Sequence, residues 1–232
     1  MASTLKIDTV TTPDGTGNIA FSRPITGDGS NLTGILPAAG TSGNVLTSDG
    51  TNWASQAAAG GGAWNLIGTQ VASNSASLTQ TGLDSTYDSY AIAISDLLPA
   101  TDSAITYMRF GDSSGIDSGA ADYNWHVASW NAAAEVRNDN SDSKIELGHE
   151  DGVDSTAGSL QAMLFLNTPG DGVGYHMISG TGVTGAGSGT NRYNHVFGGG
   201  YRIDATLDRV QIYFSSGNIT SGRMTVWGIA HS

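Results

Sequence analysis

Three short motifs match patterns that carry catalysis or cofactor binding in proteins. The first, Gly111-Asp112-Ser113-Ser114-Gly115, fits the G-x-S-x-G pattern of a hydrolase nucleophile elbow. That elbow needs a strand, a strained turn and then a helix, so that the serine is exposed above the helix N-terminus. The residues that follow, IDSGAADY, have the composition of a loop. We therefore expect a surface turn after a strand, and no catalytic serine.

The second motif, GTGVTG at 180–185, fits the G-x-G-x-x-G pattern of dinucleotide binding. Asp204 lies near the spacing of an acidic ribose ligand. A helix must follow the glycines to hold the pyrophosphate, whereas this chain continues AGSGTNRYNHVFGGGYR, without a run of helix formers. We expect a mobile glycine-rich loop that joins two strands, and no cofactor.

The third motif, HEDGVD at 149–154, gathers oxygen ligands of the kind that calcium prefers. It lacks the spaced Asp-x-Asp-x-Asp-Gly pattern, so an acidic turn without an ion is expected and no metal site is predicted. The chain has no cysteine, which excludes disulfides and cysteine-based metal sites. A pair of glycosidase carboxylates is defined by its separation in space and has no sequence motif, so no catalytic residue is predicted.

Aromatic residues are better candidates for ligand contact than the acids. Sugar rings stack on flat aromatic faces, while Asn, Asp and Gln bond their hydroxyls. Two stretches, 123–130 and the glycine-rich 191–203, hold the candidate receptor-binding residues: Tyr123, Trp125, Trp130, Tyr193, His195 and Tyr201. A regular strand places Trp125 and Trp130 on opposite faces, so one of them is expected in the core.

The composition predicts strands as the elements that position these residues. The 232 residues include 33 Gly, and Thr, Ser, Asn and Asp are abundant. Apolar residues nowhere recur at helical spacing for three turns, so an all-β chain is predicted. The net charge of −12 argues against nucleic acid as a partner. With no long apolar run and no signal peptide, we expect no membrane insertion and no secretion.

The charge is distributed unevenly along the chain. Residues 84–154 hold 14 acidic and 3 basic side chains, whereas later residues hold 3 acidic and 4 basic ones. Such a segment is either a solvated acidic surface or a face that binds cations.

Residues 1–62 and 63–232 differ in their apolar content and in the structure that they predict. The first 62 residues contain only 12 large apolar residues, scattered singly or in pairs, and end in a flexible Ala/Gly linker. Such a segment is either disordered or an extended arm that copies of itself bury, and its Pro-Asp-Gly turn signal favours the arm. Residues 63–232 show about eleven strand candidates, among them 64–71, 159–167 and 207–215, that alternate with turn residues. They predict an antiparallel β-sandwich, jelly-roll-like, as a single C-terminal domain.

Several segments resemble parts of bacteriophage tail fibres. STLKIDTVTTPDGTGNIAF, ITGDGSNLTGI and GTSGNVLTSDGTNWAS resemble their N-terminal segments. SYAIAISDLLPATDSAITYMRF and the closing VQIYFSSGNITSGRMTVWGIAHS resemble their C-terminal receptor-binding heads. Together these segments cover about half the chain. The resemblance implies a homotrimer, an N-terminal arm docked on the virion, and a head that contacts the host surface.

This resemblance implies a virion tail protein made in the bacterial cytoplasm. Its arm would dock on a tail or adaptor protein, and its head would bind a host polysaccharide or protein. The candidates for virion anchoring are the arm's first apolar residues: Leu5, Ile7, Val10, Ile19 and Phe21. Two alternatives stay open, an architectural neck or decoration fibre and a polysaccharide hydrolase. The second is disfavoured because enzymatic tail spikes resemble long, repetitive β-helices.

Overall fold

The computed structural model describes residues 44–48, 53–57, 63–87, 89–156, 158–167, 175–186 and 191–230. The chain divides into two compact units, Met1–Ala59 and Gly60–Ser232. Every regular element among the described residues is a β-strand, and every pairing is antiparallel. The predicted all-β class is confirmed.

The described part of the first unit is a small hairpin. Its strands are β1 (Asn44–Ser48) and β2 (Trp53–Ala57), which pair from Asn44 with Ala57 to Ser48 with Trp53. The residues outside the described ranges include the five proposed for virion anchoring: Leu5, Ile7, Val10, Ile19 and Phe21. Their role stays a prediction.

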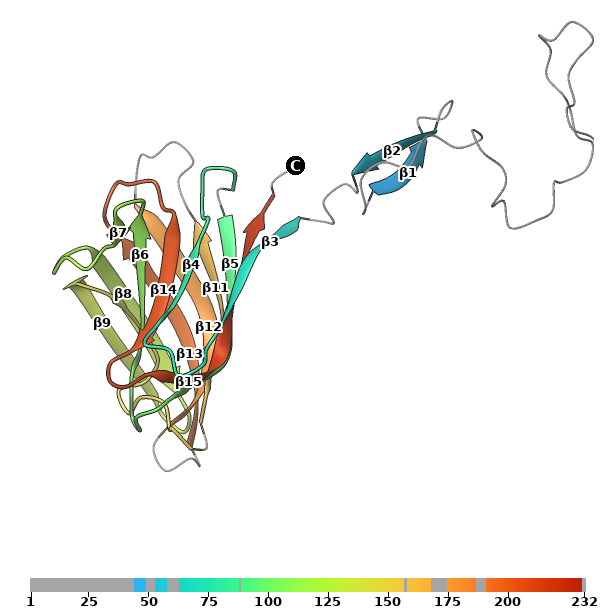
Figure 1. Cartoon of the computed structure of the whole chain (residues 1–232). Helices are drawn as coiled ribbons and strands as arrows, with labels where there is room; N and C mark the ends of the chain where they lie inside the picture. The colour runs from blue at the N-terminus through green and yellow to red at the C-terminus, as the bar shows by residue number, and fades with distance from the viewer. Residues whose placement is uncertain are drawn as a thin grey trace, which may run out of the picture. The chain divides into compact units, whose positions relative to one another are not determined.

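The second unit contains two sheets (Figure 1). The eight-stranded sheet has the following order: β3 (Trp64–Val71), β15 (Ile219–Ile229), β5 (Ser89–Pro99), β11 (Leu160–Asn167), β12 (His176–Ala186), β13 (Asn191–Tyr201), β8 (Tyr123–Trp130) and β9 (Ala134–Asp142). The five-stranded sheet has the order β10 (Ile145–Leu147), β6 (Thr106–Asp112), β14 (Arg209–Phe214) and β4 (Leu78–Thr81), and β7 (Gly115–Ile116) pairs with β6.

One hydrophobic core lies between the two sheets. Buried and partly exposed residues alternate along β14, so that Val210, Ile212 and Phe214 face the core. They join one buried cluster with residues of the larger sheet such as Ile92 and Leu164. Each sheet therefore has one apolar inner face, and the outward side chains of the larger sheet are free to form a site.

A buried tyrosine connects the two sheets. Phe110, on β6, donates its backbone N–H to the Tyr123 hydroxyl on β8 at 2.9 Å, and this hydroxyl donates to the Asp117 carbonyl at 2.9 Å. Phe110 lies between the part of β6 that pairs with β10 and the part that pairs with β7. The hydroxyl thus satisfies a buried N–H that those pairings leave open.

Replacing Tyr123 by Phe tests this connection. We expect the Tyr123→Phe protein to lose about 1–3 kcal/mol of unfolding free energy, because the buried Phe110 N–H then lacks an acceptor. Urea unfolding measures the loss. Tyr175→Phe is the matched control, since Tyr175 is 59% exposed; equal stabilities of the two variants would contradict the role of the Tyr123 hydroxyl.

Candidate functional site

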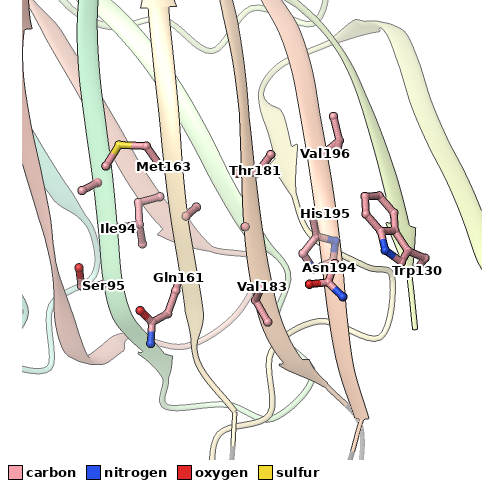
Figure 2. A pocket seen from close by; sticks show the side chains of 13 residues that line it. Ile94, Ser95, Trp130, Gln161, Met163, Thr181, Val183, Asn194, His195 and Val196 are labelled. Carbon is pink, nitrogen blue, oxygen red and sulfur yellow. The ribbon is translucent and has the colours of Figure 1, made fainter. Parts of the chain in front are cut away.

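An open depression of about 540 Å³ lies on the eight-stranded sheet. Its side chains come from β5, β11, β12, β13 and β8, which are neighbours in the sheet (Figure 2). One row pairs Gln161 with Val183, Val183 with Asn194, and Asn194 with Trp130. The next row contains Ala93, Met163, Thr181 and Val196. The antiparallel register therefore gathers residues that are far apart in the sequence.

No side chain that lines the depression is an acid, a lysine or an arginine. The polar groups are the amides of Gln161 and Asn194 and the hydroxyls of Ser95 and Thr181, beside the half-exposed indole of Trp130. Amides both donate and accept hydrogen bonds, and the indole offers a flat apolar face. This set can bind an uncharged ligand that carries both hydroxyl groups and apolar ring faces.

A hydrogen bond at the rim holds one of these amides. Gln161 donates from Nε2 to Asp96 Oδ1 at 3.1 Å. Asp96 has a positive φ of 52° at an irregularity of β5, where the register with β15 and β11 shifts. Asp is among the residues that tolerate this backbone conformation. The irregularity thus places a carboxylate where it orients Gln161.

The six predicted receptor-binding residues do not form one site in the structure. Trp130 lines the depression and is 38% exposed, whereas Trp125 is 6% exposed. The two residues lie on opposite faces of β8, as the alternation predicts, and Trp125 donates from Nε1 to Asp142 at 3.0 Å. Tyr123 and Tyr201 are fully buried, and the Tyr201 hydroxyl donates to Asp117. These three buried aromatic residues are core residues in this fold.

The remaining two predicted residues lie on β13. His195 is buried, and its ring nitrogens lie 2.8 Å from the hydroxyls of Ser129 and Thr184. Tyr193 is half-buried, stacks on His149 with ring centroids 4.1 Å apart, and donates to Asp151. Of the six candidates, Trp130 is therefore the one whose exposed side chain lines the depression.

Sequence reasoning did not select most residues of the site. Gln161 and Met163 occupy alternate positions of a predicted strand, and Thr181 and Val183 occupy alternate positions of β12, where the sequence predicts a loop. This alternation is their only signal in the sequence. Such alternation shows that they face away from the core. It does not show which strands are neighbours in the sheet, and this order creates the depression.

The first two chemical motifs have structural roles. Residues 111–115 form the end of β6, a turn and β7, and Asp112 accepts a hydrogen bond from the Ser114 backbone N–H. The predicted surface turn after a strand is confirmed. The loop predicted at 180–185 is wrong, because these residues lie inside β12. A Cβ on Gly180 would lie 2.3 Å from the Met163 carbonyl oxygen, so close approach of the strands requires glycine there.

Residues 135–152, in the acidic part of the chain, form hydrogen bonds and ion pairs with one another. His149 Nε2 lies 2.7 Å from Glu135 Oε2, and the backbone N–H of Gly152 donates to the His149 carbonyl. Arg137 pairs with Glu146 at 3.0 Å, and burial is the main factor that raises the pKa of Glu146. Within the part of the chain that the structure describes, no three His, Cys, Asp or Glu side chains are grouped to hold a metal ion.

The chain matches no protein-family model and no curated protein sequence. Within the described ranges, no helix has the length and apolar character needed to cross a membrane.

Proposed function

We propose that this chain is a receptor-binding protein of a bacteriophage tail, of the tail-fibre type. Residues 1–62 fix a homotrimer to a tail or adaptor protein, and the C-terminal head adsorbs to a glycan on the host surface. The observation that carries this proposal is the uncharged depression, in which amides and hydroxyls surround one half-exposed indole. The resemblance of both ends of the sequence to tail fibres supports it.

The lining of the depression favours a saccharide over other ligand classes. A nucleotide or another phosphate ligand would need cationic groups, and none lines the depression. A sugar ring offers hydroxyls to Gln161 and Asn194 and an apolar face to Trp130. Binding of this kind involves no catalytic step.

The position of the depression on the sheet fits a receptor-binding role. β3 begins at Trp64, which pairs with Ile229, and Ile229 pairs with Ser89 at the same end of the sheet. At the other end, Val71 pairs with Arg223 and Arg223 with Ser95, which lines the depression. The proposed glycan site therefore lies toward the end of the sheet opposite to the one where the chain enters it.

The order of the strands supports a jelly-roll-like sandwich as the head's topology. Consecutive strands change sheets several times, from β3 to β4, then to β5 and to β6, and again from β13 to β14 to β15. Such crossings between two antiparallel sheets are typical of Greek-key sandwiches. In a homotrimer, three shallow sites would then act together, since tethered sites multiply weak affinities.

Adsorption of the purified full-length protein tests the proposal. It is applied to a glycan array and to envelope polysaccharides from a panel of bacteria, and retention is measured. Saturable retention on a defined glycan supports receptor binding. Lack of retention on every surface, even when the protein is displayed multivalently, would reject it, and release of reducing sugar would establish a hydrolase instead.

A further inference from the structure

A second surface of the eight-stranded sheet is apolar and lies where β3 begins. It comprises Trp64 and Leu66 of β3, Trp227 of β15, Phe165 of β11 and Met177 of β12, and we call it the Trp64 patch. Leu66 is 63% exposed and Met177 is 60% exposed. The Trp64 ring meets the Phe165 ring edge-on at 6.1 Å and lies 5.9 Å from Trp227. These side chains form one contiguous surface, not scattered exposed residues.

The strand register explains why these residues meet. Trp227 pairs with Leu66 on one side and with Ala91 on the other, and Ala91 pairs with Phe165. All four therefore point away from the core in one row. Soluble monomers seldom leave contiguous apolar surfaces of this kind open to water, so the patch is expected to be covered.

The charges on the molecule favour a second copy of this chain as the cover. The chain carries a net charge of −12, so two copies repel each other over most of their surface. The patch has no charged side chain, and its outward neighbours are also uncharged: Ser89, Ala91, Asn167, Ser179 and Ile229. Copies can approach closely across this face with little electrostatic cost.

The position of the patch along the chain points to the same partner. It begins at Trp64, directly after residues 1–62, whose few apolar residues are expected to be buried by copies of the same segment. Copies held together by that segment would present this end of the sheet to one another at high effective concentration. A hollow of about 600 Å³ beside Phe165 and Met177 gives room for a side chain from another copy.

We infer that the Trp64 patches of neighbouring copies pack against each other in the assembled protein. The inference rests on the proposed homotrimer and does not depend on the ligand of the depression. The Trp64 patch lies toward the end of the sheet face where β3 begins, and the proposed glycan site lies toward the other end. The two adjoin on β11, where Met163 lines the depression and Phe165, two residues further on, belongs to the patch.

Cysteine cross-linking of the full-length protein tests the inference, because the chain has no cysteine of its own. Leu66→Cys places a thiol in the patch. Val136→Cys is the matched control, since Val136 is 66% exposed on β9, beyond β8 at the other edge of the sheet. Under mild oxidation we expect the Leu66→Cys protein to form disulfide-linked dimers. Each trimer can form one such disulfide, so at most two of every three chains become linked. We expect the Val136→Cys protein to stay unlinked. Equal linkage of the two variants, or none in either, would overturn the inference.

A charge placed in the patch gives a second, independent measurement. Phe165→Asp should raise the protein concentration at which the assembly dissociates by about 10-fold or more, while Val136→Asp should leave it unchanged. Sedimentation equilibrium measures both. A monomeric wild-type protein would overturn the homotrimer as well as the patch. A stable trimer that tolerates Phe165→Asp would overturn the patch alone, and the affinity of a single head for glycan would be unaffected by either result.

Discussion

Trp130→Ala is expected to lower the affinity of each head for the proposed glycan receptor about 10-fold, which corresponds to about 1.4 kcal/mol. The indole is 38% exposed and is the one aromatic side chain in the depression. Truncation removes the flat apolar face on which a sugar ring would stack and leaves the amides of Gln161 and Asn194 in place. Because three sites would act together in the proposed homotrimer, its adsorption should fall by far more than 10-fold.

The measurement compares the retention of wild-type and variant protein on the glycan that the wild type binds. Tyr175→Ala is the control, since Tyr175 is an exposed aromatic residue that does not line the depression. Both variants alter exposed side chains, so both should keep the stability of the wild type. If Trp130→Ala and Tyr175→Ala bound glycan equally well, the depression would not be the receptor site.

Much of the fold is predictable because its strands carry strong local patterns. The segment predicted at 64–71 coincides with β3, and the one at 207–215 contains β14 (Arg209–Phe214). In β14, Val210, Ile212 and Phe214 alternate with polar or half-exposed residues, so that the period of two is visible in the sequence. The alternation of apolar and polar residues is enough to predict a strand wherever one of its faces is buried.

The strand β9 shows where this reasoning fails. Its sequence, AEVRNDNSD, is mostly polar, and Val136 is its only large apolar residue. β9 is the last strand of the sheet, paired on one side with β8 alone. An edge strand gains its order from hydrogen bonds to its neighbour more than from apolar burial, so the hydrophobic pattern is weak.

The candidate site was predictable only in part, for a related reason. Aromatic residues mark both sugar-binding surfaces and sandwich cores, and composition does not distinguish the two. Tyr123 and Trp125 fall on the inner face of β8, whereas Trp130, an odd number of positions away from Trp125, falls on the outer face. The alternation predicts that the two tryptophans lie on opposite faces of the strand. Which of them is exposed depends on the face that packs on the second sheet, and that is a property of the whole fold.

His195 is a titratable group inside the core, where its hydrogen-bond partners are two hydroxyls. Its two ring nitrogens bond the hydroxyls of Ser129 and Thr184, which can each donate or accept, so the neutral ring is fully satisfied. Burial is the main factor that lowers its pKa, and the charge of the nearby His149 adds to the effect. The pKa falls from 6.5 to about 4. The folded protein therefore disfavours protonation of this ring.

Acidification should consequently destabilise the protein through His195. Between pH 6.5 and 4 the unfolded chain binds a proton at this residue that the folded chain does not, so stability falls as the pH falls. The shift predicts a loss of about 3 kcal/mol of unfolding free energy between pH 7 and pH 4, a large fraction of the stability of an ordinary domain.

His195→Gln keeps groups that can bond both hydroxyls but cannot titrate, so its unfolding free energy should fall by about 3 kcal/mol less over the same range. Urea unfolding at a series of pH values and one protein concentration measures this difference, with the exposed His126→Gln as the control that should follow the wild type. Parallel profiles for wild type and His195→Gln would show that His195 does not cause the acid sensitivity.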